Sequence, residues 1–470
     1  MTADSAEAFA LGQDEIAALR KQLRGPLLLP GEPAYDEARS VWNAMIDRRP
    51  TLVARCLDVG DVVTAVNFAR DHNIPLSVKG GGHNIAGLAV GPGLLLDFSL
   101  MREVQLDPAA RTARAAAGCL LSDVDQATQV YGLAAPLGFV STTGIAGLTL
   151  GGGFGYLTRR AGWTCDNLLS LNVVTATGEI VVASAEENPD LFWGLRGGGG
   201  NFGVVTSFEY RLYPVGPEIY GGIRFWPAED APAVLDLYRT LVASAPPEQV
   251  CVAFLRFAPP APWLPPEIHF KPVVGILICD TGPLADAAER AAPIKSFGAP
   301  LGDVLQPRTY LSQQSLLDAT QPPGRRNYWK SEYLPRLEPA LLEWAIAHAR
   351  RMVSPYSAII LFPIGGALNR LPEGHSAAGN RDAAFALIIA CAWEDAAADA
   401  DNISWVRSTW RDLRAFSTGG TYVNFLTAEE GEERIRAAYG PNYARLVEVK
   451  RRWDPENLFH TNKNIVPRPA

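Results

Sequence analysis

The sequence predicts an α+β fold that is divided into more than one domain. Residues 51–215 mix short apolar strands with helices, without the strict strand–helix–strand repetition of parallel α/β proteins. Residues 220–415 combine longer strands with longer helices, which is typical of an antiparallel sheet with helices on one face. The length of 470 residues also exceeds what one ordinary core holds, so we expect two or three domains.

The first block divides into short elements separated by turns. Residues 52–56 predict a strand, and Asp61 is expected to cap the following helix, where apolar residues recur at helical spacing. Further strands are predicted at 75–78, 94–98, 103–107 and 112–117, and a helix at 122–131. Two strands at 171–175 and 179–182 are joined by Thr177 and Gly178, which is the signature of a hairpin.

The second block has many prolines between its strands and helices. Its clearest strands are predicted at 273–279 and 385–393, and its clearest helices at 337–352 and 402–416. The apolar run at 358–368 is too short to cross a membrane and is interpreted as a buried strand. The tail from 417 predicts two charged helices near 429–439 and 443–453. The carboxylate pairs Glu186-Glu187 and Glu429-Glu430 fall in polar surroundings and are expected to be solvated.

Composition excludes several classes of function. The chain has 42 Lys and Arg against 50 Asp and Glu, a net charge of −8, which argues against a nucleic-acid partner. We expect no membrane span, since no apolar run reaches about 18 residues, and no secretory signal at the N-terminus. The six cysteines lack metal-site spacing, so neither a disulfide framework nor a zinc site is expected. A cytoplasmic protein, monomeric or homodimeric, is the resulting expectation.

Three glycine clusters are candidates for ligand binding, at residues 80–82, 151–155 and 197–203. Glycine permits backbone conformations in which successive N–H groups converge on a phosphate. The third cluster matches GxGxxG, but it leads into a strand instead of opening a helix, so it does not predict a Rossmann site. No cluster fits the P-loop pattern. Each cluster taken alone is equally consistent with simple turns.

His83 is the most informative single residue. Three glycines precede it directly after a predicted strand, which leaves its imidazole with little steric cover and free to act as a nucleophile. The other five histidines stand in no such context and are expected to be structural or solvated. No paired-histidine spacing indicates a metal.

These motifs together carry a family resemblance. The stretch SVKGGGHNIAG (77–87) resembles the flavin-attachment loop of FAD-linked oxidases in the vanillyl-alcohol oxidase superfamily, whose FAD-binding domain is of the PCMH type. Residues 138–160, 163–167 and 190–205 agree with it, and YVN (422–424) with residues 449–465 resembles the C-terminal segment of berberine-bridge-enzyme-like and 6-hydroxy-D-nicotine-oxidase-like members. The resemblance covers about residues 50–215 and 415–467.

The resemblance implies a covalent bond from His83 to the 8α carbon of FAD and a set of cofactor contacts. Lys79 would carry a positive charge near the pyrophosphate, where many relatives have Arg, and Val181 would meet the adenine through its backbone. Tyr422, Asn424 and Asn462 would return from the tail to the isoalloxazine. The remaining implied cofactor contacts are Val78, Gly80, Gly81, Gly82, Asn84, Thr142, Thr143, Gly144, Gly147, Gly152, Gly155 and Asn167.

Two departures from the family pattern shape the chemistry. Val140 stands where bicovalent relatives have a second attachment cysteine, so a single link is expected, and Cys165 is interpreted as a buried structural thiol. Ile388 stands where plant relatives place a Glu or Gln on a cap strand, so that base is missing. Tyr422, Asn424 and Lys330 are the catalytic candidates that remain, unless the substrate is an amine that is oxidised in its neutral form.

The implied architecture is a two-lobed FAD-binding domain (1–218), an inserted substrate-binding cap (219–415) and a C-terminal segment (416–470) that returns to the first domain. The implied function is oxidation of a small molecule at a C–H next to O or N, with molecular oxygen as acceptor and hydrogen peroxide as product. Thr143, a small residue where relatives gate oxygen, favours an oxidase. A dehydrogenase of the same fold, a flavin- or drug-binding protein without turnover, and a nucleotide-binding enzyme without flavin remain alternatives, and the substrate stays open.

Overall fold

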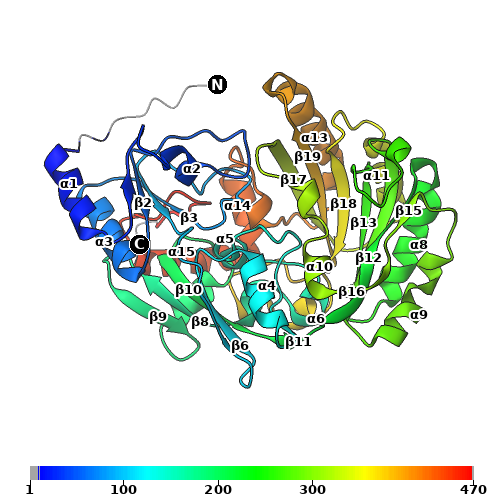
Figure 1. The fold of residues 1–470 in the computed structure, drawn as a ribbon, viewed down its shortest axis with the longest axis horizontal. Helices are drawn as coiled ribbons and strands as arrows, with labels where there is room; N and C mark the ends of the chain where they lie inside the picture. The colour runs from blue at the N-terminus through cyan, green and yellow to red at the C-terminus, as the bar shows by residue number, and fades with distance from the viewer. Residues whose placement is uncertain (1–8, 10, 468–470) are drawn as a thin grey trace.

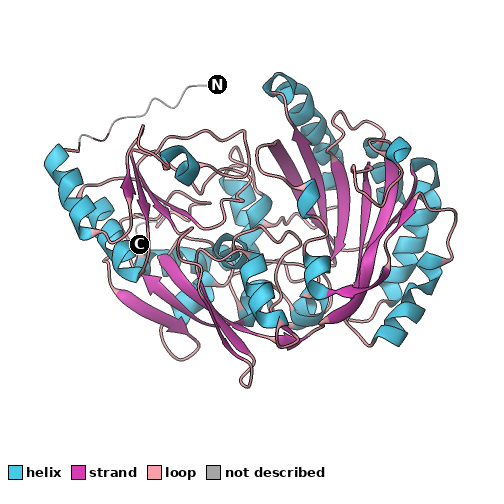
Figure 2. Ribbon diagram, viewed as in Figure 1, coloured by secondary structure: helices cyan, strands magenta, loops and turns pink. Residues whose placement is uncertain are grey.

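The computed structural model describes residue 9 and residues 11–467. It confirms the predicted mixture of helices and separate sheets, as Figures 1 and 2 show. Two strand-containing lobes built mainly from the first half of the chain lie on one side of Figure 1, and a large sheet lies on the other. The tail, coloured orange to red, returns to the lobes.

The first lobe is a four-stranded sheet in the order β1-β2-β4-β3, formed by Leu27–Leu28, Leu52–Arg55, Leu94–Asp97 and Leu76–Lys79. β4 pairs in parallel with both β2 and β3. Helices α1 (Gln13–Gln22), α2 (Tyr35–Arg39) and α3 (Val59–Asp71) accompany it. The predicted cap of α3 was wrong by one turn: the carboxylate of Asp58 accepts the N–H of Asp61 at 3.2 Å, while Asp61 is buried and accepts N–H groups from residues 24, 25 and 57.

The second lobe is a five-stranded antiparallel sheet in the order β5-β6-β10-β8-β9. Its strands are Val104–Asp107, Thr112–Ala116, Val204–Arg211, Leu168–Val174 and Ile180–Ser184. The predicted hairpin is confirmed by the β8–β9 pairing, and the strand predicted after the third glycine cluster is β10. The helices here are α4 (Leu121–Gln129), α5 (Ile145–Leu150), α6 (Thr158–Ala161) and α7 (Pro189–Leu195), and a short pair joins β7 (Leu133–Ala134) to β11 (Tyr213–Pro214).

The third sheet, called the cap sheet here, is antiparallel throughout and has the order β15-β12-β14-β13-β18-β19-β17, with β16 also paired to β12. Its strands are β12 (Glu218–Pro227), β13 (Gln249–Phe257), β14 (Pro272–Asp280), β15 (Gly302–Asp303), β16 (Gln306–Thr309), β17 (Arg326–Leu334), β18 (Ala358–Pro363) and β19 (Phe385–Trp393). The apolar run 358–368 was predicted as one strand, but the strand that it forms, β18, ends at Pro363.

The two faces of the cap sheet belong to different cores because strand side chains alternate. On β13, Val252 and Phe254 join the core shared with the two lobes, whereas Cys251 and Ala253 join a second core under the helices. That second core includes side chains of α8 (Ala231–Ser244), α9 (Leu284–Lys295), α11 (Pro339–Ala349) and α13 (Asp399–Leu413). The prediction of helices on one face is confirmed, and the opposite face is left for the lobes.

The tail helices α14 (Glu432–Tyr439) and α15 (Tyr443–Trp453) follow the cap, and α15 contacts α7. Two further short helices connect cap strands along the chain: α10 (Tyr310–Gln314) follows β16, and α12 (Ala367–Arg370) follows β18. Over the part of the chain described here, no helix has the length and apolar character needed to cross a membrane.

Candidate functional site

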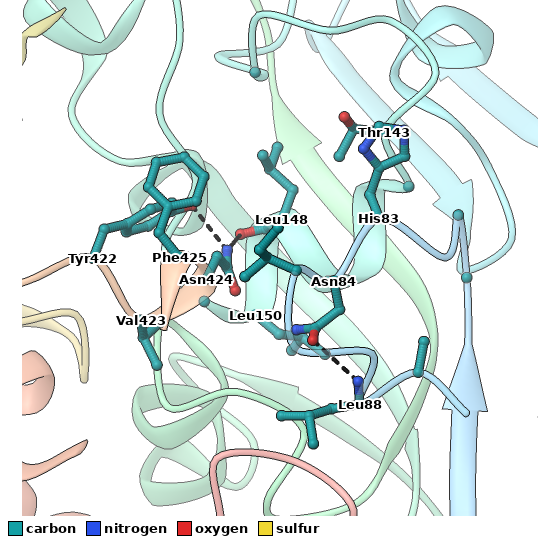
Figure 3. A pocket seen from close by; sticks show the side chains of 18 of the residues that line it. His83, Asn84, Leu88, Thr143, Leu148, Leu150, Tyr422, Val423, Asn424 and Phe425 are labelled. Carbon is teal, nitrogen blue, oxygen red and sulfur yellow. Dashed lines mark hydrogen bonds between the residues drawn. The ribbon is translucent and has the colours of Figure 1, made fainter. Parts of the chain in front are cut away.

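One cavity of about 360 Å³ lies between the lobes, the tail and the cap sheet. Its wall is assembled from segments far apart in sequence: residues 76–89, 138–154, 199–205, the cap strands β13, β17, β18 and β19, and the tail residues 422–425 and 459–463. Figure 3 shows His83 and Thr143 on one side of it and Tyr422, Asn424 and Phe425 on the other.

Glycines allow two loops of the wall to touch through their backbones. A Cβ on Gly81 would come within 2.3 Å of the amide nitrogen of Gly144, and one on Gly144 within 2.2 Å of that of Gly81. Any side chain at either position would therefore force the loops apart. The contact joins the loop after β3 to the start of α5 and gives the cavity a wall of exposed backbone.

His83 stands at the edge of this wall. Its ring stacks on Trp42, with ring centroids 5.0 Å apart and planes 17° from parallel, and its Nε2 lies 3.3 Å from Oγ1 of Thr142. Burial lowers the pKa of His83 to about 4, so the imidazole is neutral in the neutral pH range and one ring nitrogen keeps its lone pair. A neutral, held imidazole facing a cavity is suited to nucleophilic attack.

The tail closes the wall with a set of amide and phenol groups. The hydroxyl of Tyr422 accepts hydrogen bonds from the N–H of Gly153 at 3.0 Å and from Nδ2 of Asn424 at 2.9 Å. Burial raises the pKa of Tyr422, so the phenol keeps its proton. Asn462 donates to the carbonyl of Gly200 at 3.0 Å, and its buried Oδ1 has no partner among the described residues.

The cap contributes a mostly apolar face. Phe254, Ile360, Phe362, Ile388 and Ala390 line the cavity there. Ile388 thus lies at the position where the sequence predicted a missing base, and among the lining residues that the structure describes there is no Asp or Glu.

The predicted site residues separate into two groups. The lining group contains Val78, Gly80, Gly81, Gly82, His83, Asn84, Thr143, Gly144, Gly147, Tyr422, Asn424 and Asn462. The other predicted contacts, Lys79, Thr142, Gly152, Gly155, Asn167 and Val181, are not part of the lining. Lys79 lies 3.4 Å from Asp97 and donates to the carbonyl of Ala38, and a Cβ on Gly155 would meet the carbonyl oxygen of Leu137 at 1.8 Å.

Lys330, predicted among the catalytic groups, lies on the other face of its strand. Its neighbour Trp329 lines the cavity, and alternation along β17 turns Lys330 away. Its Nζ pairs with Glu430, donates to Oγ1 of Thr427 at 2.9 Å and lies 3.1 Å from Glu429. The expectation that Glu429 and Glu430 are both solvated was wrong, because the side chain of Glu430 is only 6% exposed.

Two features of the site escaped the sequence analysis, and a third was recognised only in part. Trp42 lies 41 residues before His83 and stacks on its ring, and no local sequence pattern indicated this contact. Arg256 lines the cavity from β13, a strand that the sequence analysis did not predict. The third glycine cluster was visible but rejected as a Rossmann motif, and yet Gly199, Gly200 and Asn201 line the cavity.

Among the residues that the structure describes, neither the cysteines nor any other group of side chains offers a metal site. All six cysteines are buried and unbonded, and burial raises the pKa of Cys165. Val140 lines the cavity, and no cysteine does so among the residues with described positions. In the same part of the chain, no group of three or more His, Cys, Asp or Glu side chains could hold a metal ion.

Comparison with known proteins decides the family. The family described as "FAD binding domain" matches residues 50–184, and that described as "Berberine and berberine like" matches residues 421–466. The chain is 30% identical over 463 residues to (R)-6-hydroxynicotine oxidase of Paenarthrobacter nicotinovorans, over 95% of this chain and 97% of the relative. The chain belongs to the FAD-linked oxidoreductase family.

Other family members and solved structures agree. An FAD-linked oxidoreductase, pgmH of Aspergillus terreus, is 31% identical over 97% of both chains. The structure of 6-hydroxy-D-nicotine oxidase from Arthrobacter nicotinovorans superposes with a TM-score of 0.83 at 27% identity, over 95% of this chain and 98% of that one. BBE-like 1 of Physcomitrella patens shares the fold, with a TM-score of 0.86 at 22% identity over 97% and 100% of the two chains. The predicted PCMH-type fold is thereby confirmed.

The wall of the cavity fits the FAD of this family. Gly147 and Gly200 both line it, and a Cβ on either would meet no atom within 4 Å. The wall therefore leaves room beside bare backbone, as a dinucleotide requires. The unpaired Oδ1 of Asn462, which lines the cavity, supplies an acceptor for a ring N–H or an amine. These residues, with the loop that carries His83, would hold the cofactor.

We expect Gly147→Val to lower FAD binding without unfolding the protein. The added side chain would occupy cavity volume that the protein itself leaves open. Crowding of this kind costs about 1–3 kcal/mol, which corresponds to roughly tenfold or more in affinity. Flavin absorbance per protein after reconstitution measures the loss. Gly374→Val is the control, because Gly374 is equally open but lies outside the lining; equal flavin content in both variants would contradict the assignment.

Proposed function

We propose that this FAD-linked oxidoreductase is an oxidase, which removes hydride from a C–H next to oxygen or nitrogen of a small molecule and reduces molecular oxygen to hydrogen peroxide. We propose further that His83 holds FAD covalently. The cofactor, when bound, supplies the two-electron chemistry. The observation that carries the proposal is a single cavity that joins the glycine wall with His83 to the apolar face of the cap.

The residues of the chain would orient the substrate and exclude water. Phe254, Phe362 and Ile388 give the cap side an apolar surface on which a small organic molecule loses its hydration. The lack of a lining carboxylate among the described residues favours a substrate that needs no strong base, such as a neutral amine. Thr143 lines the cavity and leaves space where a larger side chain would hinder oxygen.

Tyr422 would act as a hydrogen-bond donor to the reacting end of the substrate. Its oxygen already accepts two protein hydrogen bonds, so its own proton is left for a ligand. The raised pKa makes the phenol a poor base and a stable donor at neutral pH. This supports orientation of the substrate by a hydrogen bond from Tyr422, with Asn424 holding the phenol in place.

A substrate screen on the purified flavoprotein tests the proposal. Amines, alcohols, sugars and polycyclic phenols are mixed with it without oxygen, and bleaching of the flavin absorbance is followed. Bleaching that reverses on admission of air, with stoichiometric peroxide, is the expected result. A reduced flavin that persists in air but is reoxidised by a dye would replace the oxidase by a dehydrogenase. Tight binding across the panel with no bleaching would replace it by a binding protein without turnover.

Tyr422→Phe should lower kcat/KM by about tenfold, the cost of losing one hydrogen bond that positions the substrate, while the flavin stays bound. The measurement uses the substrate that the screen finds, with flavin content determined in parallel. Tyr439→Phe is the matched control, because Tyr439 also lines the cavity but its hydroxyl donates to the carbonyl of Gly198 at 3.3 Å. Equal kcat/KM in the two variants would remove Tyr422 from the chemistry.

A further inference from the structure

Arg256 is a cation on the cap face of the cavity with unused hydrogen-bonding capacity. Its Nε donates to the carbonyl of Phe257 at 3.0 Å. No described residue supplies an acceptor or a carboxylate to its two terminal nitrogens. The neighbouring Arg325 differs, since Glu394 lies 3.7 Å from it and its guanidinium stacks on the ring of Tyr356 at 3.6 Å. Arg256 therefore enters the cavity as an unpaired charge.

The electrostatics of the cavity favour an anionic guest. The charged side chains of its lining are Arg256 and Lys463, and no described residue of the lining is a carboxylate. The Nζ of Lys463 donates to the carbonyl of Thr427 and lies near Glu429 and Glu430, so Arg256 is the charge without a partner. Burial and the nearby charge of Arg325 lower the pKa of Arg256 to about 10, so it remains protonated at neutral pH but is poorly compensated. A partly desolvated guanidinium without a partner is costly and gains most from a carboxylate.

The register of the cap sheet fixes the length of the surface on which a bound molecule would lie. Trp329, Ala390, Ala358 and Arg256 are paired in one row across β17, β19, β18 and β13, and all four line the cavity. Strands lie about 4.8 Å apart, so about 14 Å separates the two ends of the row. The row therefore has two small side chains, those of Ala390 and Ala358, in its middle, with Trp329 at one end and the guanidinium of Arg256 at the other.

We propose that the substrate carries a carboxylate that binds Arg256 and an apolar, two- or three-ring body that lies over Ala358 and Ala390. The inference rests on the proposed function, because it names the substrate class of that same cavity. The planar fork of a guanidinium matches a carboxylate with two parallel hydrogen bonds. The apolar body then extends toward Trp329, which makes an edge contact with Trp42 at 5.4 Å, next to His83.

The position of Arg256 separates it from the residues expected to hold the cofactor. Those residues belong to the glycine loops and the tail, whereas Arg256 lies on a cap strand. Lys463, beside Asn462, also lines the cavity, but its Nζ donates to the carbonyl of Thr427, which is not part of the lining. The unpaired cation of the cavity is therefore on the cap wall, where it is available to the substrate.

Ligand titration of the holoprotein tests this inference. 1-Naphthoate, 2-naphthoate and indole-3-carboxylate are each compared with the corresponding amide, by flavin difference spectra and by thermal shift. We expect at least one acid to bind more tightly than its amide. Arg256→Met should weaken that acid by about tenfold or more and leave the amide unchanged, since a charge-assisted bond is lost. Arg256→Lys should fall between, and Arg239→Met, at an exposed arginine paired with Asp236, should match the wild type.

Each outcome of this titration either supports or overturns the proposed carboxylate site at Arg256. No preference for any acid over its amide overturns the inference, as does an acid affinity that Arg256→Met leaves unchanged. Loss of FAD in Arg256→Met, with acid binding retained, assigns the guanidinium to the cofactor and also overturns it. Arg256-dependent acid binding in a protein whose flavin no compound reduces supports the anion site and contradicts the proposed oxidase. Substrate-driven bleaching without Arg256-dependent acid binding supports the proposed oxidase and overturns the anion site.

Discussion

Protein carrying His83→Ala will lose covalent FAD completely, while the wild type gains the mass of one FAD. The reason is chemical: His83 presents a neutral imidazole, held against Trp42 at the edge of the glycine wall, where burial keeps its pKa near 4. The variant should still bind FAD reversibly, because the glycine loops and Asn462 are unchanged. Acid precipitation followed by intact mass measures the link: a yellow pellet for the wild type, and a white pellet under a yellow supernatant for the variant.

His460→Ala serves as the control for that experiment. His460 is exposed and lies in the tail between two lining residues, but it does not line the cavity itself. It should keep the added mass. A yellow pellet from His83→Ala would place the link on another side chain, and a white pellet from the wild type would remove the covalent bond altogether while leaving an FAD-binding protein.

The glycine wall could be predicted from the sequence because its information is local. Gly81 and Gly144 must lack side chains for their loops to touch, and each lies in a short motif that follows or precedes an element. His83 could be found for the same reason, since its position after three glycines is visible in the chain. The strands and the hairpin of the second lobe followed from alternating apolar residues and one turn signal.

The residues that could not be predicted depend on the face of a strand or on distant partners. Lys330 and Trp329 are adjacent in sequence, but alternation sends one behind the cap sheet and the other into the cavity, and only the pairing of β17 with β19 decides which. Arg256 likewise lines the cavity because of the face of β13 on which it lies, and the sequence alone does not determine that face. Trp42 joins His83 through tertiary packing alone. Sequence reasoning therefore found the lining residues of the glycine loops better than those of the cap strands.

A second prediction with a large expected effect concerns the contribution of Lys330 to stability. Lys330→Met should lower the free energy of unfolding by about 1.5–3 kcal/mol, because buried Glu430 loses its nearer cation and keeps Arg434, at 3.8 Å. The side chains of Lys330 and Glu430 are 5% and 6% exposed, so water cannot replace the lost ion pair. The pair also ties β17 to the tail segment that begins at Tyr422, and its loss should loosen that segment. Denaturant unfolding followed by circular dichroism measures the change.

The double variant Lys330→Met/Glu430→Leu distinguishes an ion pair that is merely costly to break from a catalytic lysine. Replacing both charges by apolar groups removes the carboxylate that has lost its nearer cation, so most of the lost stability should return. Flavin reduction by substrate should then proceed at close to the wild-type rate, because Lys330 lies behind the sheet and does not line the cavity. Arg239→Met, which breaks an exposed pair, should cost at most about 1 kcal/mol. A stable double variant that no longer reduces flavin would restore Lys330 to the chemistry, as the sequence predicted.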